Sequence, residues 1–291
     1  MRREFELTTE NYYTPEADQH FLSCSQFESF LECEAAAMAK IEGRYEPKKS
    51  KAFIVGNYFH TAFESREAHE EFVEDNYEEI YQKNGKLRAD FAKADEMIAH
   101  AIADPAIRRI VDMPGENEKI MTGKLFGHYP WRIRLDKYID DPVRMIIDWK
   151  TVANIHELSW NEEMNQRTSF VRTFRYLFRA AVYMEIEKQY AGCDQDPLFR
   201  LVCISKQDPP DKEMVDLNNR QELDFELEKV KDKIWDIQAI KDGRKKPRRC
   251  GRCAYCRSTK KLSGALDYWQ LDPGNYPDLE EEYDELCHLQ K

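Results

Sequence analysis

The chain has 291 residues, 42% hydrophobic and 34% charged, which predicts a soluble globular protein with a sizeable core. No apolar run approaches the roughly 18 residues that a membrane-spanning helix needs, which excludes an integral membrane protein. The net charge of −11 argues against bulk attraction of nucleic acid over the whole surface.

The first residues, MRREFELTTENYY, lack the apolar segment of a secretory signal peptide. We therefore expect a cytoplasmic protein. In that compartment the eight cysteines are expected to be reduced or bound to metal rather than paired in disulfides.

The N-terminal part of the chain predicts an arm and then a helix. Residues 1–22 are polar and aromatic without a clear period. A helix is then expected, with Ser23 or Ser25 as its N-cap and Gly43 as its C-cap. Cys33 is expected to lie on this helix.

Two further helices are predicted before the first strand. Residues 52–69 form the first, where Gly56 and His60 lie one turn apart on the same face. Residues 86–113 form the second, with a break at Asp104-Pro105.

The composition then changes to that of β-strands. Strands are expected over 119–127, 129–138 and 143–150, with a turn at Asp140-Asp141-Pro142 between the last two. In the middle strand, apolar residues alternate with polar ones, and Asp136 falls on the polar face.

The last of these strands ends in Asp148-Trp149-Lys150. Because side chains alternate along a strand, Asp148 and Lys150 point to one side and Trp149 to the other. A hairpin would bring Asp136 close to them, which would build a divalent-metal hydrolysis site. The alternative reading is a surface hairpin with an ion pair.

After this hairpin the pattern predicts a helix over 157–190, strands over 197–206 and 213–217, and a helix over 221–240. No internal repeat or clean domain boundary is visible. The simplest architecture is one α/β domain over 1–291 with an N-terminal helical arm.

Four motifs together resemble the PD-(D/E)XK nuclease superfamily and, within it, the RecB/RecE-type phage exonucleases. They are Gly56-Asn57-Tyr58-Phe59-His60, Asp136 in an R-x-R-x-D strand, Asp148-Trp149-Lys150, and Tyr183. The resemblance spans roughly residues 25–260 and implies a restriction-endonuclease-like core, a mixed central sheet flanked by helices. The chain departs from the family pattern at Arg179, where the family has a glutamine.

The resemblance also implies a catalytic metal. Asp136, Asp148 and the Trp149 carbonyl would hold Mg²⁺ or Mn²⁺, because hard cations take oxygen ligands. His60 would complete the metal shell from its helix. Lys150 would orient or help to deprotonate the attacking water and stabilise charge in the transition state.

Three further residues are assigned by the same resemblance. Glu118 is the candidate acid one strand upstream, and the choice between it and Glu116 stays open. Tyr183 and Arg179 would contact DNA from their helix.

Cys250, Cys253 and Cys256 form a C-x2-C-x2-C run, a spacing that grips one metal ion or cluster. Cys33 is a candidate fourth ligand, because a subgroup of RecB-like nucleases closes an iron–sulfur cluster with one early and three late cysteines. A 4Fe–4S cluster, Zn²⁺ and reduced thiols all stay open.

Residues 244–261 hold nine lysines and arginines and no acid. Within them, Arg248, Arg249, Arg252 and Arg257 are candidates for contacts with DNA phosphates. The alternative is a solubilising loop. Residues 276–291 form an acidic tail.

The sequence therefore predicts a Mg²⁺-dependent DNA nuclease, an exonuclease serving phage-type recombination or DNA processing. A single-strand annealing or recombination protein is the expected partner, homo-oligomerisation stays open, and no membrane is involved. The alternative is a catalytically inactive nuclease-fold protein that binds DNA or serves assembly, stabilised by a cysteine-bound metal.

Overall fold

The computed structural model describes residues 5–48, 50–262, 264–265 and 267–271. The predicted acidic tail at 276–291 lies outside these residues. The chain clusters into two compact units, the first of Met1–Pro47, Phe126–Trp131 and Val230–Lys291, the second of Lys48–Leu125 and Arg132–Lys229. One strand and one helix run through both units, and the single domain over 1–291 stays a prediction.

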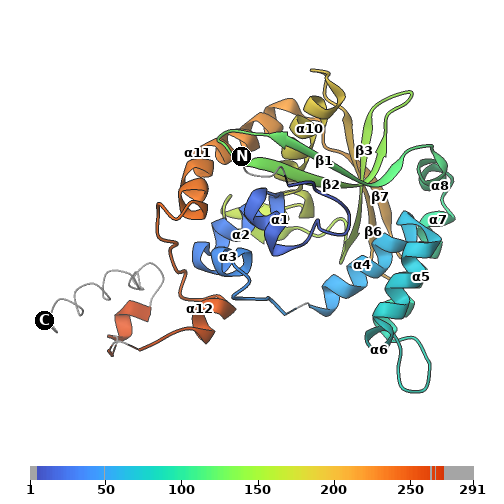
Figure 1. The fold of residues 1–291 in the computed structure, drawn as a ribbon. Coiled ribbons are helices and arrows are strands. Elements are labelled where there is room, and N and C mark those ends of the chain that lie inside the picture. The colour runs from blue at the N-terminus through green and yellow to red at the C-terminus, as the bar shows by residue number, and fades with distance from the viewer. Residues whose placement is uncertain (1–4, 49, 263, 266, 272–291) are drawn as a thin grey trace, which may run out of the picture. The chain divides into compact units, whose positions relative to one another are not determined.

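The second unit is built on a five-stranded mixed sheet (Figure 1). Its order is β1-β2-β3-β6-β7, formed by Glu116–Lys124, Pro130–Ile139, Met145–Val152, Leu198–Ser205 and Lys212–Asp216. The β2–β3 and β6–β7 pairs are antiparallel, whereas β3 and β6 are parallel. The two central strands, β3 and β6, are buried along most of their length, as their apolar sequences predicted.

Helices cover both faces of this sheet (Figure 1). On one face, Phe59 and Phe63 of α4 (Lys51–Glu64) and Met97 of α7 (Ala89–Ile102) share a core cluster with Trp149. The helix α8 (Pro105–Asp112) contributes Ile107 and Ile110 to the same cluster. On the other face lies α10 (Tyr176–Ala191), whose Tyr183 packs edge-on against Phe199 of β6.

The helix predicted over 52–69 is wrong in its continuity, because it is interrupted at Ser65. It ends at Glu64, and α5 (Arg66–Asp75) begins a new helix, followed by α6 (Tyr77–Ile80). The break has a local cause, because the Ser65 hydroxyl accepts a hydrogen bond from the Ala68 amide and caps α5. The predicted break at Asp104-Pro105 is confirmed, with Asp104 capping α8.

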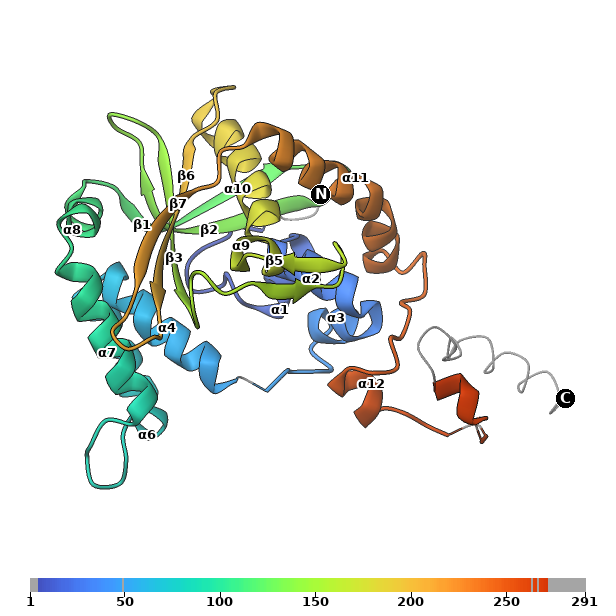
Figure 2. The same cartoon turned by 180° about the vertical axis from the view of Figure 1, so that it is seen from behind.

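The helix predicted over 157–190 is wrong in its first part. Residues Ser159–Asn161 and Gln166–Thr168 instead form the hairpin β4–β5 (Figure 2). A short helix, α9 (Phe170–Thr173), joins the hairpin to α10. The Trp160, Met164 and Phe174 side chains are exposed here, so the apolar spacing reflects solvent-facing side chains and not a buried helix face.

The first unit contains α1 (Pro15–His20), α2 (Cys24–Glu32), α3 (Glu34–Ile41), the second half of α11 (Arg220–Lys241), α12 (Ala254–Ser258) and the 3₁₀ turn η1 (Tyr268–Leu271). The arm predicted for 1–22 therefore contains a helix. Ser23 caps α2 as expected. Cys33 does not lie on one continuous helix, because its backbone is extended and separates α2 from α3.

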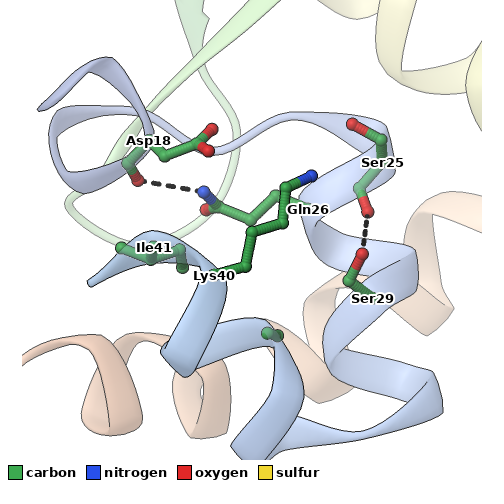
Figure 3. Close-up of a pocket in the computed structure, with 7 residues that line it drawn as sticks. Asp18, Ser25, Gln26, Ser29, Lys40 and Ile41 are labelled. Atoms are coloured by element: carbon green, nitrogen blue, oxygen red, sulfur yellow. Dashed lines mark hydrogen bonds between the residues drawn. The ribbon is translucent and has the colours of Figure 1, made fainter. Parts of the chain in front are cut away.

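One half-buried lysine connects the early helices of this unit to α11. Lys241 Nζ donates to the carbonyls of Asp18 and Phe21 and to the Gln26 side chain, at 2.8–2.9 Å. Figure 3 shows a small polar pocket beside them, lined by residues that include Gln26, Ser25 and Lys40. Its volume of about 20 Å³ suits one water molecule and is far too small for a nucleotide.

Among the described residues, no helix combines the length and the apolar character needed to cross a membrane.

Candidate metal centres

The first candidate centre lies on β3, where Asp148 and Lys150 point to the same side as predicted. Both are buried, at 4% and 9% exposure, and Lys150 Nζ forms an ion pair with Asp148 Oδ2. The same ammonium group donates a hydrogen bond to the Trp149 carbonyl at 3.1 Å. The Trp149 ring points the other way and stacks on Phe63 at 4.3 Å, which fixes the direction of the two polar side chains.

Asp136 reaches this strand from β2, as the hairpin predicted. Its Oδ2 accepts a hydrogen bond from the Trp149 amide at 2.8 Å and lies 3.2 Å from Nδ1 of His60 on α4. Burial raises the pKa of Asp136, but the cationic groups of His60 and Lys150 and these hydrogen bonds outweigh it. The pKa therefore lies below its ordinary value, and the carboxylate is ionised.

The upstream acid that faces this site is Glu118 rather than Glu116. The Glu118 side chain is 14% exposed and lies 2.5 Å from Nε of Arg134. Glu116 is 60% exposed and pairs with Lys119. The Glu118 backbone has a φ of 53°, a left-handed conformation that is strained for a residue with a side chain.

Burial raises the pKa of Glu118 to about 7; Arg134 opposes this rise, whereas Asp136 and Glu64 add to it. Glu64 was missed by the sequence reasoning. It lies one turn beyond His60 on α4, and burial raises its pKa too, with Asp136 adding to the rise. The (i, i+4) spacing from His60 was the signal that could have found it.

The donor set of this centre fits a hard divalent cation. The buried Asp148 carboxylate, the half-buried Asp136 carboxylate and the Trp149 carbonyl offer the oxygen ligands that Mg²⁺ or Mn²⁺ takes, and the His60 imidazole lies beside them. Lys150 pairs with Asp148, and His60 Nδ1 lies beside the Asp136 carboxylate. The Lys150 ammonium neutralises the buried Asp148 carboxylate, because uncompensated buried charge is costly.

On α10, the two residues predicted to contact DNA have different surroundings. Tyr183 packs against Phe199, with ring centroids 6.1 Å apart. The guanidinium of Arg179 lies over the ring of Tyr176 at 5.9 Å, and Lys150 Nζ lies 5.7 Å from the same ring. Arg179, which replaces the glutamine of the family pattern, therefore shares an aromatic neighbour with Lys150.

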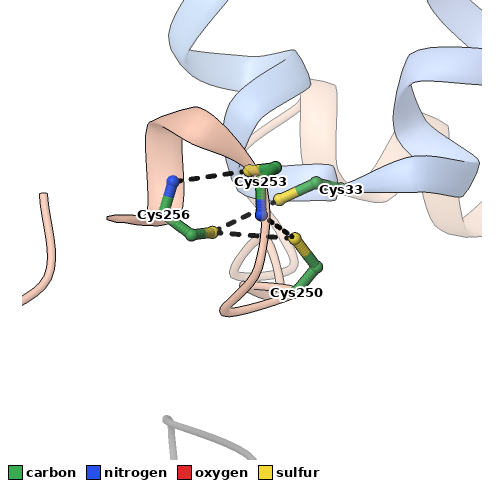
Figure 4. Close-up of side chains that lie close together, drawn as sticks. All are labelled: Cys33, Cys250, Cys253 and Cys256. Carbon is green, nitrogen blue, oxygen red and sulfur yellow. Dashed lines mark hydrogen bonds between the residues drawn. The ribbon is translucent and has the colours of Figure 1, made fainter. Parts of the chain in front are cut away.

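The second candidate centre joins Cys33 to the late C-x2-C-x2-C run, all within the first unit (Figure 4). The four sulfur atoms lie within 4.8 Å of one another. Cys256 Sγ is 3.6 Å from Cys33 Sγ and 3.9 Å from Cys250 Sγ. Among the described residues, these thiols are the group whose ligand atoms already lie within reach of one metal ion.

The surroundings of the cysteines shift the pKa values of their thiols in different directions. Burial raises the pKa of Cys256 to about 12. For Cys250, burial is outweighed by hydrogen bonds from the amides of Arg252 and Cys253, which lower the pKa to about 7. Such amide donors toward sulfur are typical of loops that hold metal-bound thiolates.

Two arginines of this segment make contacts within the segment itself. Arg249 donates to the Cys256 carbonyl at 3.2 Å and lies over the Tyr255 ring, and Arg257 donates to the Arg252 carbonyl. The side chain of Arg248 is 66% exposed. Contacts of these arginines with DNA stay a prediction.

The sequence matches the family model described as "PDDEXK-like domain of unknown function (DUF3799)" over residues 23–259. The fold matches the crystal structure of a protein from Eubacterium rectale described as a "Putative exonuclease", with a TM-score of 0.85 and 34% identity. That match covers 93% of this chain and 100% of the other.

The structure of SSO0001 is 13% identical over 72% of this chain and 84% of that chain, and its TM-score of 0.29 carries no argument. No curated protein matched the chain.

These matches confirm the predicted restriction-endonuclease-like α/β fold, with its mixed five-stranded sheet between helices. They also confirm the resemblance that the G-x-x-x-H, R-x-R-x-D and D-W-K motifs carried. The chain belongs to the PDDEXK-like DUF3799 family, within the PD-(D/E)XK nuclease superfamily.

Proposed function

We propose that this protein is a Mg²⁺-dependent deoxyribonuclease whose centre comprises Asp136, Asp148, Lys150 and His60. The observation that carries the proposal is the convergence on Trp149. Its amide holds the Asp136 carboxylate and its carbonyl holds the Lys150 ammonium, so the backbone of one residue fixes both groups. A surface hairpin with an ion pair would not bury Asp148 and Lys150 at 4% and 9% exposure.

Each residue then has a role that follows from its surroundings. Asp136 and Asp148 would hold Mg²⁺, together with the Trp149 carbonyl. When bound, the ion would supply charge neutralisation at the phosphate and activation of a water molecule. His60 keeps Asp136 oriented and is available as a further ligand. Lys150, released from Asp148, would hold the attacking water or donate to a phosphate oxygen.

We further propose exonuclease action on linear DNA, in recombination or DNA processing. Its support is the description of the E. rectale protein at 34% identity, together with the complete motif set of this chain. A partner such as a single-strand annealing protein would take over the strand that digestion exposes.

A digestion time course tests the proposal, with linear duplex, circular duplex and single-stranded DNA in Mg²⁺, Mn²⁺, Ca²⁺ or chelator. We expect mononucleotides or short products from linear DNA in Mg²⁺ and Mn²⁺, intact circles, and no cleavage in chelator. Cleavage that continues in chelator would overturn the metal dependence. If circular DNA is nicked or linearised, the protein is an endonuclease and the proposed exonuclease action is wrong.

We also propose that the four cysteines bind a single tetrahedral Zn²⁺. A Zn–S bond of about 2.3 Å gives sulfur atoms roughly 3.8 Å apart in a tetrahedron. The separations of 3.6 and 3.9 Å at Cys256 support this geometry. A 4Fe–4S cluster places four irons between its thiolates and would hold them farther apart.

A further inference from the structure

The corner between α9 and α10 holds two aromatic rings in opposite surroundings. Arg175 forms the corner with a φ of 53°, a left-handed backbone that costs about 1 kcal/mol for a non-glycine residue. On one side of it, Phe174 is 57% exposed, whereas Tyr176 on the other side is half-buried beside Lys150. The strained corner therefore separates a solvent-facing ring from a ring that contacts the candidate catalytic lysine.

Tyr176 connects Phe174 to the candidate centre. The Phe174 and Tyr176 centroids are 6.2 Å apart, and the buried Phe170 supports Tyr176 from 6.1 Å. The cationic groups of Lys150 and Arg179 lie within 6 Å of the Tyr176 ring. A phosphate held by these two cations would place the neighbouring nucleotide beside the Phe174 ring.

Phe174 is part of a group of exposed apolar side chains. Leu158, Trp160 and Met164 of the β4–β5 region are 41–57% exposed, and α9 packs against this hairpin. The Thr168 and Thr173 hydroxyls, 3.0 Å apart, tie the hairpin to α9. Single exposed apolar residues are ordinary, but a group next to a candidate active site indicates a binding surface.

We propose that Phe174, supported by Tyr176, stacks on the base of an unpaired nucleotide next to the scissile phosphate. This rests on the proposed nuclease function and adds a substrate preference to it. A nucleotide combines an anion with a flat π-surface, which matches two cations beside an exposed ring. Paired bases stay inside the duplex, so the ring reaches only a frayed or single-stranded end.

The test compares Phe174→Ala, Phe174→Trp and the matched control Phe225→Ala. Phe225 lies on α11 of the same unit and is 61% exposed. The substrates are single-stranded and blunt duplex DNA in Mg²⁺, each also with an abasic site at one of its terminal nucleotides. We expect Phe174→Ala to lower kcat/KM on single strands roughly 5- to 150-fold through KM, the range for one lost base stack.

Two features of the result identify stacking. Phe174→Trp and Phe225→Ala should keep wild-type kcat/KM. One abasic position should lower kcat/KM of the wild type and leave that of Phe174→Ala unchanged, because the ring and the base act as a pair. The inference is wrong if Phe174→Ala cleaves like wild type. It is also wrong if the losses in kcat/KM from Phe174→Ala and from the abasic site multiply at every abasic position.

A binding readout separates this inference from the proposed function. A single strand with terminal 2-aminopurine is titrated in Ca²⁺, and fluorescence quenching reports stacking on a ring. We expect quenching with wild type and Phe174→Trp, and its loss with Phe174→Ala. A wild type that quenches but never cleaves in Mg²⁺ would overturn the proposed nuclease and retain the stacking. A wild type that cleaves DNA in Mg²⁺ without quenching would overturn the stacking and retain the proposed nuclease.

Discussion

At the scale of single residues, each acidic side chain of the candidate centre lies beside a basic one. Asp136 pairs with His60, Asp148 with Lys150, and Glu118 with Arg134. Each carboxylate is largely buried, so its charge needs a nearby cation or a proton. Glu118 is the member for which the compensation is incomplete, since its pKa rises to about 7.

This residue gives a pH-dependent prediction. The ordinary pKa of 4.5 applies to Glu118 in the unfolded chain, against about 7 in the folded protein. Between these values the folded state holds a proton that the unfolded state has released, so its stability falls as the pH rises. Glu118→Gln cannot titrate and should raise the free energy of unfolding above pH 7, by up to about 3 kcal/mol.

Denaturant unfolding in chelator between about pH 5 and pH 8 measures this effect. Glu116→Gln is the matched control, because that side chain is 60% exposed on the same strand. The difference in stability between Glu118→Gln and wild type should grow with pH, and the difference for Glu116→Gln should not. Parallel curves for all three proteins would contradict the assigned environment of Glu118.

Most of these residues were predictable from the sequence, but their pairing was not. Asp136, Asp148, Lys150 and His60 follow from motif spacing and strand alternation. Glu64 has no motif of its own, and its proximity to Asp136 depends on how α4 packs on the sheet. Likewise, the contact of Tyr176 with Lys150 depends on a strained turn at Arg175, which no local propensity predicts.

At the scale of elements, the strands were predicted better than the helix boundaries. The alternation in β2 and the apolar runs of β3 and β6 are direct consequences of burial on one or two faces. The errors fall at Ser65, at Cys33 and in the β4–β5 hairpin. The first two are breaks inside continuous helical patterns, and the third is a short hairpin with exposed apolar residues.

The break at Cys33 has a consequence for the cysteine cluster. The extended backbone at this residue ends α2 and lets its thiol meet Cys256 of α12 and the two cysteines that precede this helix. If Zn²⁺ joins these elements, Cys33→Ala should lose the metal and lower the unfolding temperature by several degrees. Cys24→Ala is the matched control. Cys24 lies in α2, is only 3% exposed and does not belong to the four-sulfur group.

Metal analysis and calorimetry of the purified proteins check this prediction. Wild type and Cys24→Ala should be colourless with one zinc per chain, and Cys33→Ala should be zinc-free. A brown wild-type protein containing iron and sulfide would replace zinc by an iron–sulfur cluster. Equal metal content in all three proteins would exclude Cys33 as a ligand.

At the scale of the whole molecule, charge is distributed unevenly. The net charge is −11, yet nine basic residues gather in 244–261 without an acid. Such a protein gains little from general attraction to DNA and depends on local cationic groups for contact with phosphates. Lys150 and Arg179 are such groups in the second unit, and Arg248 is an exposed one in the first.

The fold class was predictable because two kinds of information agreed. The order of helices and strands indicated an α/β core, and the motifs fell at the strand end and helix face where such a core needs them. The division into two compact units was not predictable, because the first unit assembles segments from both ends of the chain with residues Phe126–Trp131. Such non-local packing leaves no periodic trace in the sequence.

The central claim is that Asp148 and Lys150 form a hydrolytic metal centre. The most direct measurement compares Mg²⁺-dependent nucleotide release from linear DNA by wild type, Asp148→Asn and Lys150→Ala, with the exposed-charge variant Glu116→Gln as control. We expect both centre variants to lose at least about 100-fold in rate while remaining folded, because each removes a group that acts on the reacting phosphate. Wild-type rates in folded Asp148→Asn and Lys150→Ala would contradict the account.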